Sequence, residues 1–236
     1  MKLLVIIPAY NEAENIERVV EELGSYGYDY IVVNDGSADN TAEICREKGY
    51  HLLDLPVNLG LTGAVQAGMK YAYKNGYDCA LQLDGDGQHD PKYIAEMIAQ
   101  MRKNGDDIVI GSRFVTEKKP SSLRMMGSNL IQFAIRLTTG KTIQDPTSGL
   151  RLYNRKMLRE FVRDFNLTPE PDTLCYLMRC GVVVQEIHVE MRERIAGESY
   201  LNLSRSIQYM LRMGLSILLI QWFRDKKSIR EEVISG

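Results

Sequence analysis

The residues best suited to chemistry lie in one short acidic segment. Asp84 and Asp86 are two positions apart, and Gln88 adds an amide oxygen two positions further on. Oxygen ligands of this kind suit Mg²⁺ or Mn²⁺, with water and phosphate completing the coordination. Gly85 and Gly87 allow the backbone to turn tightly and to approach a ligand. Alone, such a segment is more often a surface turn, so its position in the fold decides its role.

Similar polar clusters follow three other apolar runs of the chain. They are Pro-Ala-Tyr-Asn-Glu at 8–12, Asn-Asp-Gly-Ser at 34–37 and Gly-Ser-Arg at 111–113. In a parallel α/β sheet, ligands bind beyond the carboxyl ends of the strands. If each apolar run is a strand, the four clusters meet at one edge of the sheet. The sequence therefore predicts a single site built from all of them.

The elements that must position these clusters alternate between strand and helix. Apolar runs predict strands, and amphipathic or capped stretches predict helices. The expected strands are 3–7, 30–33, 52–55, 79–83 and 108–110, and the expected helices are 13–23, 41–48, 60–74 and 91–104. Beyond residue 111 we expect a helix at 123–138 and strands at 150–153, 182–187 and 189–191. This order predicts a mostly parallel sheet flanked by helices on both faces.

The composition is that of a globular protein and excludes several classes. The chain has 236 residues, a net charge of −2 and 44% hydrophobic residues, which argues against bulk electrostatic binding of nucleic acid. The four cysteines form no Cys-x-x-Cys pair, so we expect reduced thiols rather than disulfides or structural zinc. Neither a Walker loop nor a Gly-x-Gly-x-x-Gly turn is present, which argues against nucleotide hydrolases and dinucleotide enzymes.

Several ordered motifs carry a family resemblance. VIIPAYNEAENI, VVNDGSADNT, NLGLTGAVQAG, LQLDGDGQHDP, IGSRF and DPTSGLRLYNR resemble glycosyltransferase family 2, and within it the dolichyl- or polyprenyl-phosphate sugar synthases. The resemblance extends over roughly residues 3–200, and it is specific because several motifs match in order. It implies a Rossmann-like GT-A fold, a divalent metal, a nucleoside-diphosphate sugar donor and inversion at the anomeric carbon. We accordingly expect a catalytic domain at 1–200 and a C-terminal membrane-interface or oligomerisation helix with a basic tail at 201–236.

The resemblance also implies roles for individual residues. Asp35 would contact the base, and Asp84 would be shared between the nucleoside and the metal. Asp145 opens the element on the acceptor side, and Arg194 belongs to a late loop that closes over the donor. The implied metal ligands are Asp84, Asp86 and Gln88, and the implied catalytic residues are Asp86, Asp145 and Arg194. The residues implied in donor binding are Pro8, Tyr10, Glu12, Asp35, Asp84, Gly85, Arg113, Arg124 and Ser128.

Two kinds of acceptor remain open. A lipid monophosphate is largely ionised near pH 7, because its second pKa lies at about 6, and it can attack without a base. It would need cations, which Arg113, Arg124 and Arg194 supply. A saccharide hydroxyl would instead need a base, for which Asp145 is the candidate. The family subgroup favours a polyprenyl phosphate; a catalytically silent nucleotide-sugar-binding subunit is a further alternative, and UDP and GDP are both compatible.

The C-terminal stretch 206–223 is apolar on most sides. Only eleven uncharged residues separate Arg212 from Arg224, whereas a spanning helix needs about 20. With Trp222 and the basic tail that follows, the pattern favours an interfacial helix at an anionic membrane surface. A helix packed on the catalytic domain or on a second copy is the alternative. We therefore expect a cytoplasmic protein, peripheral on the inner face of the cell membrane, anchored with a small membrane-protein partner or as a homo-oligomer.

Overall fold

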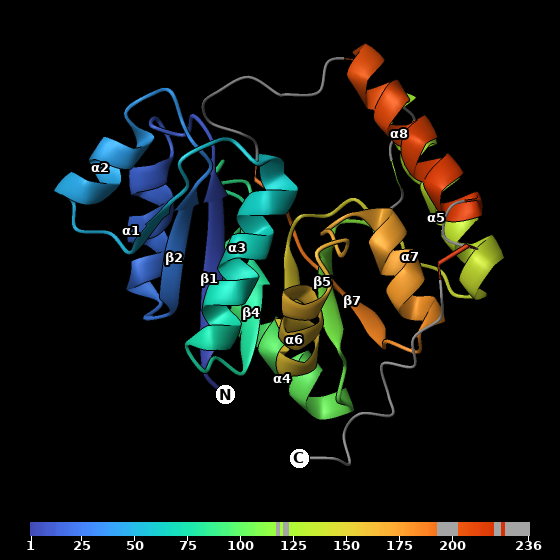
Figure 1. Ribbon diagram of the computed structural model, residues 1–236. Coiled ribbons are helices and arrows are strands. Elements are labelled where there is room, and N and C mark those ends of the chain that lie inside the picture. Colours follow the sequence, from blue (N-terminus) through green and yellow to red (C-terminus); the bar gives the residue numbers. More distant parts are fainter. Residues whose placement is uncertain (117–118, 120–122, 193–202, 220–222, 225–236) are drawn as a thin grey trace.

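A seven-stranded sheet forms the centre of the molecule (Figure 1). The computed structural model describes residues 1–116, 119, 123–192, 203–219 and 223–224, with the backbone alone at 123–124 and 203–207. The strands are β1 (Leu3–Ala9), β2 (Asp29–Asn34), β3 (Leu52–Asp54), β4 (Cys79–Gln82), β5 (Ile108–Ser112), β6 (Arg151–Asn154) and β7 (Val184–His188). All seven were expected from the sequence, with shifts of a few residues at their ends, whereas the strand expected at 189–191 is wrong: Met191 forms only an isolated bridge with His89.

The strand order is β3-β2-β1-β4-β6-β5-β7. The pairs β1–β2, β1–β4, β2–β3 and β5–β7 are parallel, whereas β6 is antiparallel to both β4 and β5. The predicted mostly parallel sheet is thus confirmed. Because β6 runs in the opposite direction, it begins at the edge where β1, β2, β4 and β5 end.

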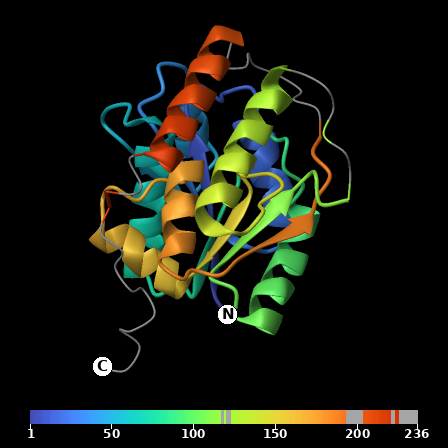
Figure 2. The same ribbon diagram turned by 90° about the vertical axis from the view of Figure 1, so that its right-hand side faces the viewer.

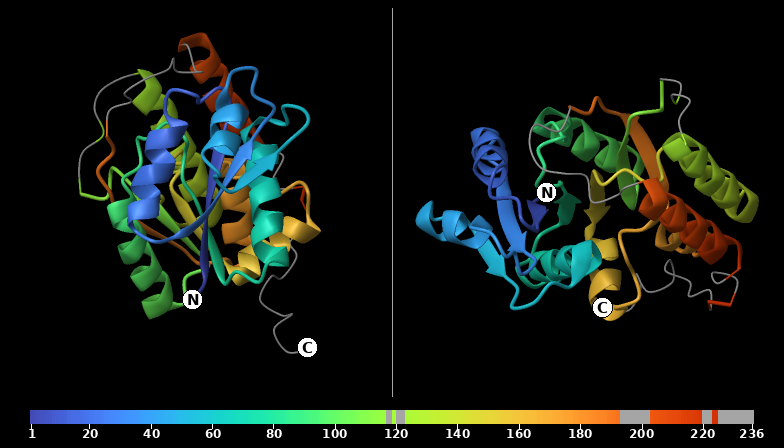
Figure 3. Two further views of the ribbon diagram at one scale, coloured as in Figure 1. Left: turned by 90° about the vertical axis from the view of Figure 1, so that its left-hand side faces the viewer. Right: turned by 90° about the horizontal axis from the view of Figure 1, so that it is seen from above.

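Helices cover both faces of the sheet, so the domain has three layers (Figure 3). One face carries α1, α2 and α4, and the other carries α3, α6 and α7, with α5 and α8 beside them. The helices are α1 (Ile16–Ser25), α2 (Thr41–Glu47), α3 (Gly60–Lys74), α4 (Ile94–Asn104, after the 3-10 turn Pro91–Tyr93), α5 (Leu123–Thr139), α6 (Arg155–Arg163), α7 (Pro171–Arg179) and α8 (Leu203–Leu218). Helices α6 and α7 were not predicted.

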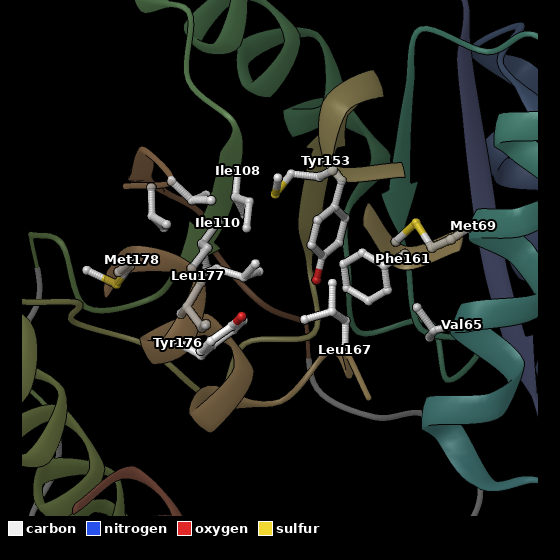
Figure 4. Close-up of a cluster of buried hydrophobic side chains, with 14 of the residues drawn as sticks. Val65, Met69, Ile108, Ile110, Tyr153, Phe161, Leu167, Tyr176, Leu177 and Met178 are labelled. Atoms are coloured by element: carbon white, nitrogen blue, oxygen red, sulfur yellow. The ribbon is translucent and has the colours of Figure 1, made fainter. Parts of the chain in front are cut away.

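The alternation of a strand explains why both faces are apolar. In β1, Leu4 and Ile6 point into the core under α3, while Val5 and Ile7 point into the core under α1 and α4. The core under α3 continues to where α6 and α7 meet the sheet (Figure 4). There the rings of Tyr153 and Phe161 pack edge to face, with centroids 5.4 Å apart.

Helices α5 and α8 lie side by side on one flank of the molecule (Figure 2). Gly127 allows their close approach, because a Cβ there would lie 2.4 Å from Met210. The inner face of α8 is buried, and α8 also contacts α7. Among the described residues, no helix combines the length and the apolar character needed to cross a bilayer.

Candidate active site at the carboxyl edge of the sheet

A pocket of about 400 Å³ opens where β1, β2 and β4 end. Its walls come from the loops after these strands and from the first turn of α3. It is lined by Pro8, Ala9, Tyr10, Glu12, Asp35, Asn58, Gly60, Leu61, Ala64, Asp84, Gly85 and Asp86. Most of the residues expected to bind the donor are therefore brought together in one cavity, of a size usual for small-molecule sites.

Hydrogen bonds between two loops hold the β1 side of the pocket. Asn11 adopts a left-handed backbone conformation with φ of 55°, and its side chain accepts from the amide of Ala38 at 2.9 Å. The amide of Glu12 donates to the hydroxyl of Thr41 at 2.9 Å, and the amide of Ala13 donates to Asp39 at 3.1 Å. These contacts join the loop after β1 to the loop after β2, and so fix Tyr10 and Glu12 relative to Asp35.

Asp35 lies at the buried end of the pocket. It is 3% exposed, and its Oδ1 accepts from the amide of Leu59 at 2.7 Å. Burial raises the pKa of Asp35, although the hydrogen bond from Leu59 opposes this. Gly36 allows the 57–58 backbone to pass close by, because a Cβ there would lie 2.7 Å from the amide nitrogen of Asn58. The carboxyl group is thus held in one orientation beside the cavity.

The acidic segment follows β4 and forms the opposite wall. Asp84 Oδ1 accepts from Gln82 at 3.2 Å, and the amide of Asp84 donates to Nδ1 of buried His89 at 3.2 Å. The His89 ring therefore has Nδ1 as an acceptor and serves to fold the turn. Asp86 Oδ1 accepts from the amide of Gln88 at 3.1 Å. The segment is a hydrogen-bonded turn whose two carboxylates, at Asp84 and Asp86, line the pocket.

The possible metal ligands fit a cation that is held partly by the protein and partly by substrate phosphates and water. Within the described ranges, no group of three or more His, Cys, Asp or Glu side chains forms a metal-binding cluster. Mg²⁺ commonly takes only one or two carboxylates, with substrate phosphates and water completing its shell. The carboxylates of Asp84 and Asp86 and the side-chain amide oxygen of Gln88 match that chemistry. Gly149 preserves the space this needs, because a Cβ there would lie 2.4 Å from Asp84 Oδ2.

Arg113 and Asp145 form a two-pronged ion pair beside this wall. Arg113 Nε lies 2.7 Å from Asp145 Oδ2, and Nη2 lies 3.0 Å from Oδ1. Asp145 has no exposed surface, while the side chain of Arg113 is 26% exposed. Each charge neutralises the other, because a bidentate pair is among the strongest contacts a carboxylate can make. A base function for Asp145 would require this pair to separate.

The turn at residues 145–150 is fixed from two sides by residues that the sequence did not single out. Glu186 accepts from the amides of Gln144 at 2.6 Å and Asp145 at 2.8 Å; burial raises its pKa and these hydrogen bonds oppose the rise. Arg151 is 2% exposed, and its guanidinium donates to the carbonyls of Ser148, Pro146 and Pro169 at 2.6 to 3.0 Å. The turn is therefore rigidly attached to the sheet.

Lys119 forms a further contact near this turn. Its Nζ donates to Ser128 Oγ at 3.1 Å and to Gln132 Oε1 at 3.2 Å, both on α5. Ser128 was expected among the donor-binding residues, but it is 1% exposed and does not line the pocket. Lys119 itself carried no motif that would have indicated a role.

The remaining predicted residues divide between neighbours of the pocket and residues outside the described part. Arg113, Asp145 and Gln88 lie beside the pocket rather than in its lining. The side chain of Arg124 lies outside the described atoms, and Arg194 lies outside the described residues. The sequence missed Asn58, Gly60, Leu61 and Ala64 as lining residues, although all belong to the motif NLGLTGAVQAG.

Arg192, which precedes the predicted late loop, is hydrogen-bonded to the acidic segment. The amide of Arg192 donates to the carbonyl of Gln88 at 2.9 Å. The Arg192 guanidinium lies 2.8 Å from Glu22 and 2.9 Å from Asp90, and the pair with Glu22 is the main cause of its raised pKa. Arg192 therefore lies directly beside Gln88, a predicted metal ligand.

A three-layer α/β domain with this pocket and acidic turn defines a glycosyltransferase of the GT-A class. The model of the family described as glycosyl transferase family 2 matches residues 4–162, and the chain belongs to that family. A UDP-N-acetylglucosamine–dolichyl-phosphate N-acetylglucosaminyltransferase of Methanococcus voltae is 33% identical, over 66% of this chain and 71% of the relative. An undecaprenyl-phosphate mannosyltransferase of Micrococcus luteus is 29% identical, over 92% and 95%.

Solved structures show the same fold. A glucosyl-3-phosphoglycerate synthase of Mycobacterium tuberculosis, in complex with Mn²⁺, UDP-glucose and phosphoglyceric acid, superposes with a TM-score of 0.66 at 16% identity. The match covers 93% of this chain and 79% of the other. The predicted GT-A type fold is thereby confirmed, and with the family it establishes a glycosyltransferase.

Proposed function

We propose that this enzyme transfers a sugar from a UDP- or GDP-sugar to a polyprenyl phosphate, with inversion at the anomeric carbon. The observation that carries the proposal is the pocket that extends from Asp35 to the Asp84–Asp86 turn. A carboxyl group at the buried end suits the N–H groups of a base, and two carboxylates at the other end suit a metal diphosphate. The relatives named above act, by their names, on dolichyl and undecaprenyl phosphates.

The geometry around Asp145 favours a phosphate acceptor over a hydroxyl. A hydroxyl must lose its proton to a base, and the carboxylate of Asp145 is fully buried and paired with Arg113. A phosphate monoester is already an anion near pH 7 and needs no base. It needs only cations and hydrogen-bond donors to hold it.

The predicted metal, Mg²⁺ or Mn²⁺, would be held by Asp84, Asp86 and Gln88. When bound, it would supply the positive charge that stabilises the leaving diphosphate. The protein's own part is to orient the diphosphate. The turn that Gln88 and His89 stabilise keeps the two carboxylates facing the pocket.

The flank formed by α5 and α8 is the proposed contact with the membrane surface. α8 buries Met210, Met213 and Ile217 against the domain, so part of the helix packs as the alternative interpretation expected. Its other face remains apolar and joins an apolar stripe on α5. The exposed apolar residues of this flank are Met126, Leu130, Phe133 and Leu137 of α5, Leu211 and Leu215 of α8, and Leu219 directly after α8. Arg136 and Arg212 are exposed on the same helices and suit anionic headgroups.

Transfer from a panel of UDP- and GDP-sugars to undecaprenyl and dolichyl phosphate tests the proposal, with labelled product extracted into solvent. Asp86→Asn should abolish transfer while the protein stays folded. Asp78→Asn is the matched control, because Asp78 precedes β4 at the opposite edge of the sheet. Activity retained by Asp86→Asn would overturn the metal-site assignment, and label found only on water-soluble saccharide would overturn the lipid acceptor.

A further inference from the structure

Arg18 of α1 lies against the acidic turn from outside the pocket. A Cβ on Gly87 would lie 2.1 Å from Nη2 of Arg18 and 3.0 Å from its Cζ, so a glycine leaves the room that the guanidinium needs. Arg18 is not among the residues that line the pocket. It lines a separate hollow, together with Ala13, Glu14, Glu17, Glu21 and Glu22. The arginine therefore contacts the turn that carries the predicted metal ligands without reaching the space for the donor.

This guanidinium has no charged partner within the described part of the chain. There, no carboxylate lies within salt-bridge distance of Arg18, and its Nη2 is buried without a hydrogen-bond partner. Neighbouring glutamates of α1 are engaged elsewhere. Glu17 pairs with Lys48, and Glu22 pairs with Arg192. A guanidinium that is partly buried and unpaired is costly, so nearby negative charge must compensate it from a distance.

The acidic turn supplies this compensating charge. Asp86 directly precedes Gly87, and consecutive Cα atoms are about 3.8 Å apart, so the guanidinium lies within about 10 Å of the Asp86 carboxylate. Asp84 adds a second carboxylate on the same short turn. Two carboxylates this close repel each other, and a fixed positive charge behind the turn reduces the cost of having both ionised.

The same charge opposes a divalent cation at the turn. A metal held by Asp84 and Asp86 would carry two positive charges, and Arg18 would repel it through the same short distance. The diphosphate of a donor brings negative charge and further oxygen ligands, which outweigh this repulsion. Arg18 therefore separates two states of the turn, one without and one with the diphosphate.

We propose that Arg18 is the counter-charge of the metal-free acidic turn, and that it thereby limits metal binding to the enzyme that also holds the nucleoside diphosphate. Arg18 is a positioning residue, because it acts through the turn and does not line the pocket. The inference rests on the proposed function, in particular on a metal held by Asp84, Asp86 and Gln88.

The test titrates the full chain with Mn²⁺ alone and measures free Mn²⁺ by electron paramagnetic resonance. Arg18→Met removes the charge but keeps most of the side-chain length. Its Kd for Mn²⁺ should fall about fivefold at low salt, because one positive charge about 10 Å from a divalent ion no longer repels it. Arg18→Lys keeps the charge and should bind Mn²⁺ as wild type does. Arg102→Met, at an exposed arginine in the last turn of α4, is the matched control and should also bind as wild type does.

The direction of the change distinguishes a charge from a packing role. Loss of packing support would loosen the turn and weaken metal binding, whereas loss of a repelling charge strengthens it. At about 0.5 M KCl the difference between wild type and Arg18→Met should narrow, because salt screens the interaction.

Three results would overturn the role of Arg18: equal Mn²⁺ binding in a folded Arg18→Met protein, weaker binding, or a gain in affinity that salt does not reduce. A wild-type protein that binds no Mn²⁺ even with saturating UDP or GDP would instead overturn the metal site of the proposed function. If Arg18→Met does not fold, Arg18→Gln replaces it, with the same outcomes.

Discussion

Replacing Gly149 by alanine tests whether the 145–150 turn and the acidic segment form one unit. The added Cβ would lie 2.4 Å from Asp84 Oδ2, whereas ordinary contact begins at 3.4 Å. The Asp84 carboxylate must therefore move by about 1 Å, since the turn is held by the buried Arg151 and by Glu186. A displacement of this size at a positioned group can cost about 100-fold in rate, or roughly 2.7 kcal/mol of transition-state stabilisation.

The assay is the initial rate of sugar transfer at varied donor and metal concentrations. We expect kcat/KM for the donor to fall about 100-fold in Gly149→Ala, with a higher metal concentration needed for half-maximal rate. The free energy of unfolding in urea should change little, because the strain can be relieved by moving one carboxylate, that of Asp84, which lines the pocket. Gly24→Ala is the matched control, since a Cβ there meets no atom within 4 Å.

A Gly149→Ala enzyme with wild-type donor kinetics would refute this reasoning. It would show that Asp84 has room to move without consequence, and that its contact with the turn does not set the donor geometry. A large loss of stability, with kinetics restored at low temperature, would instead place the effect in folding.

Two further predictions concern the loops and the flank. Burial raises the pKa of Asp39, but hydrogen bonds from Thr41 and Ala13 lower it overall, so Asp39 stabilises the fold above its unfolded pKa near 3.8 and loses this effect as pH falls through its folded pKa. The difference in unfolding free energy between wild type and Asp39→Ala should therefore shrink as the pH falls through that window. A difference that does not depend on pH would contradict this prediction. In the double variant Leu211→Ser, Leu215→Ser, the fraction of protein that floats with anionic vesicles should be about tenfold lower than in wild type, because the variant removes apolar area from the exposed face of α8. Equal flotation of the two proteins would exclude this face as the membrane contact.

The parts of the fold that repeat a simple pattern were predictable. β1 is a continuous apolar run buried on both faces, and α1 places Ile16, Val19, Val20 and Leu23 on one side. Helix α7 was missed because every residue from Thr173 to Met178 is buried, so this stretch lacks the polar face that periodicity detects. Helix α6 is short and follows β6 directly, capped by the strand's last residue Asn154.

The pocket was predictable because the carboxyl ends of the strands meet at one edge of the sheet. Polar clusters that directly follow apolar runs are visible in the sequence. The residues that support the site were not predictable, because their roles depend on contacts between distant segments. Arg151 reads as one charged residue in a strand, yet it is buried and bonded to three carbonyls. Glu186 and Lys119 lie 41 and 26 positions from Asp145 along the chain, and only tertiary packing brings them near it.

The reversed direction of β6 has a consequence for engineering the enzyme. Because β6 is inserted between β4 and β5, the turn before it joins Asp84 on one side and Arg113 on the other. A chimera that imports this turn from a relative with a different acceptor would break both junctions. The exchangeable module is therefore a discontinuous one, comprising the turn, Arg113 and the Glu186 strand β7. Acceptor preference in such a fold should be inherited in blocks rather than residue by residue.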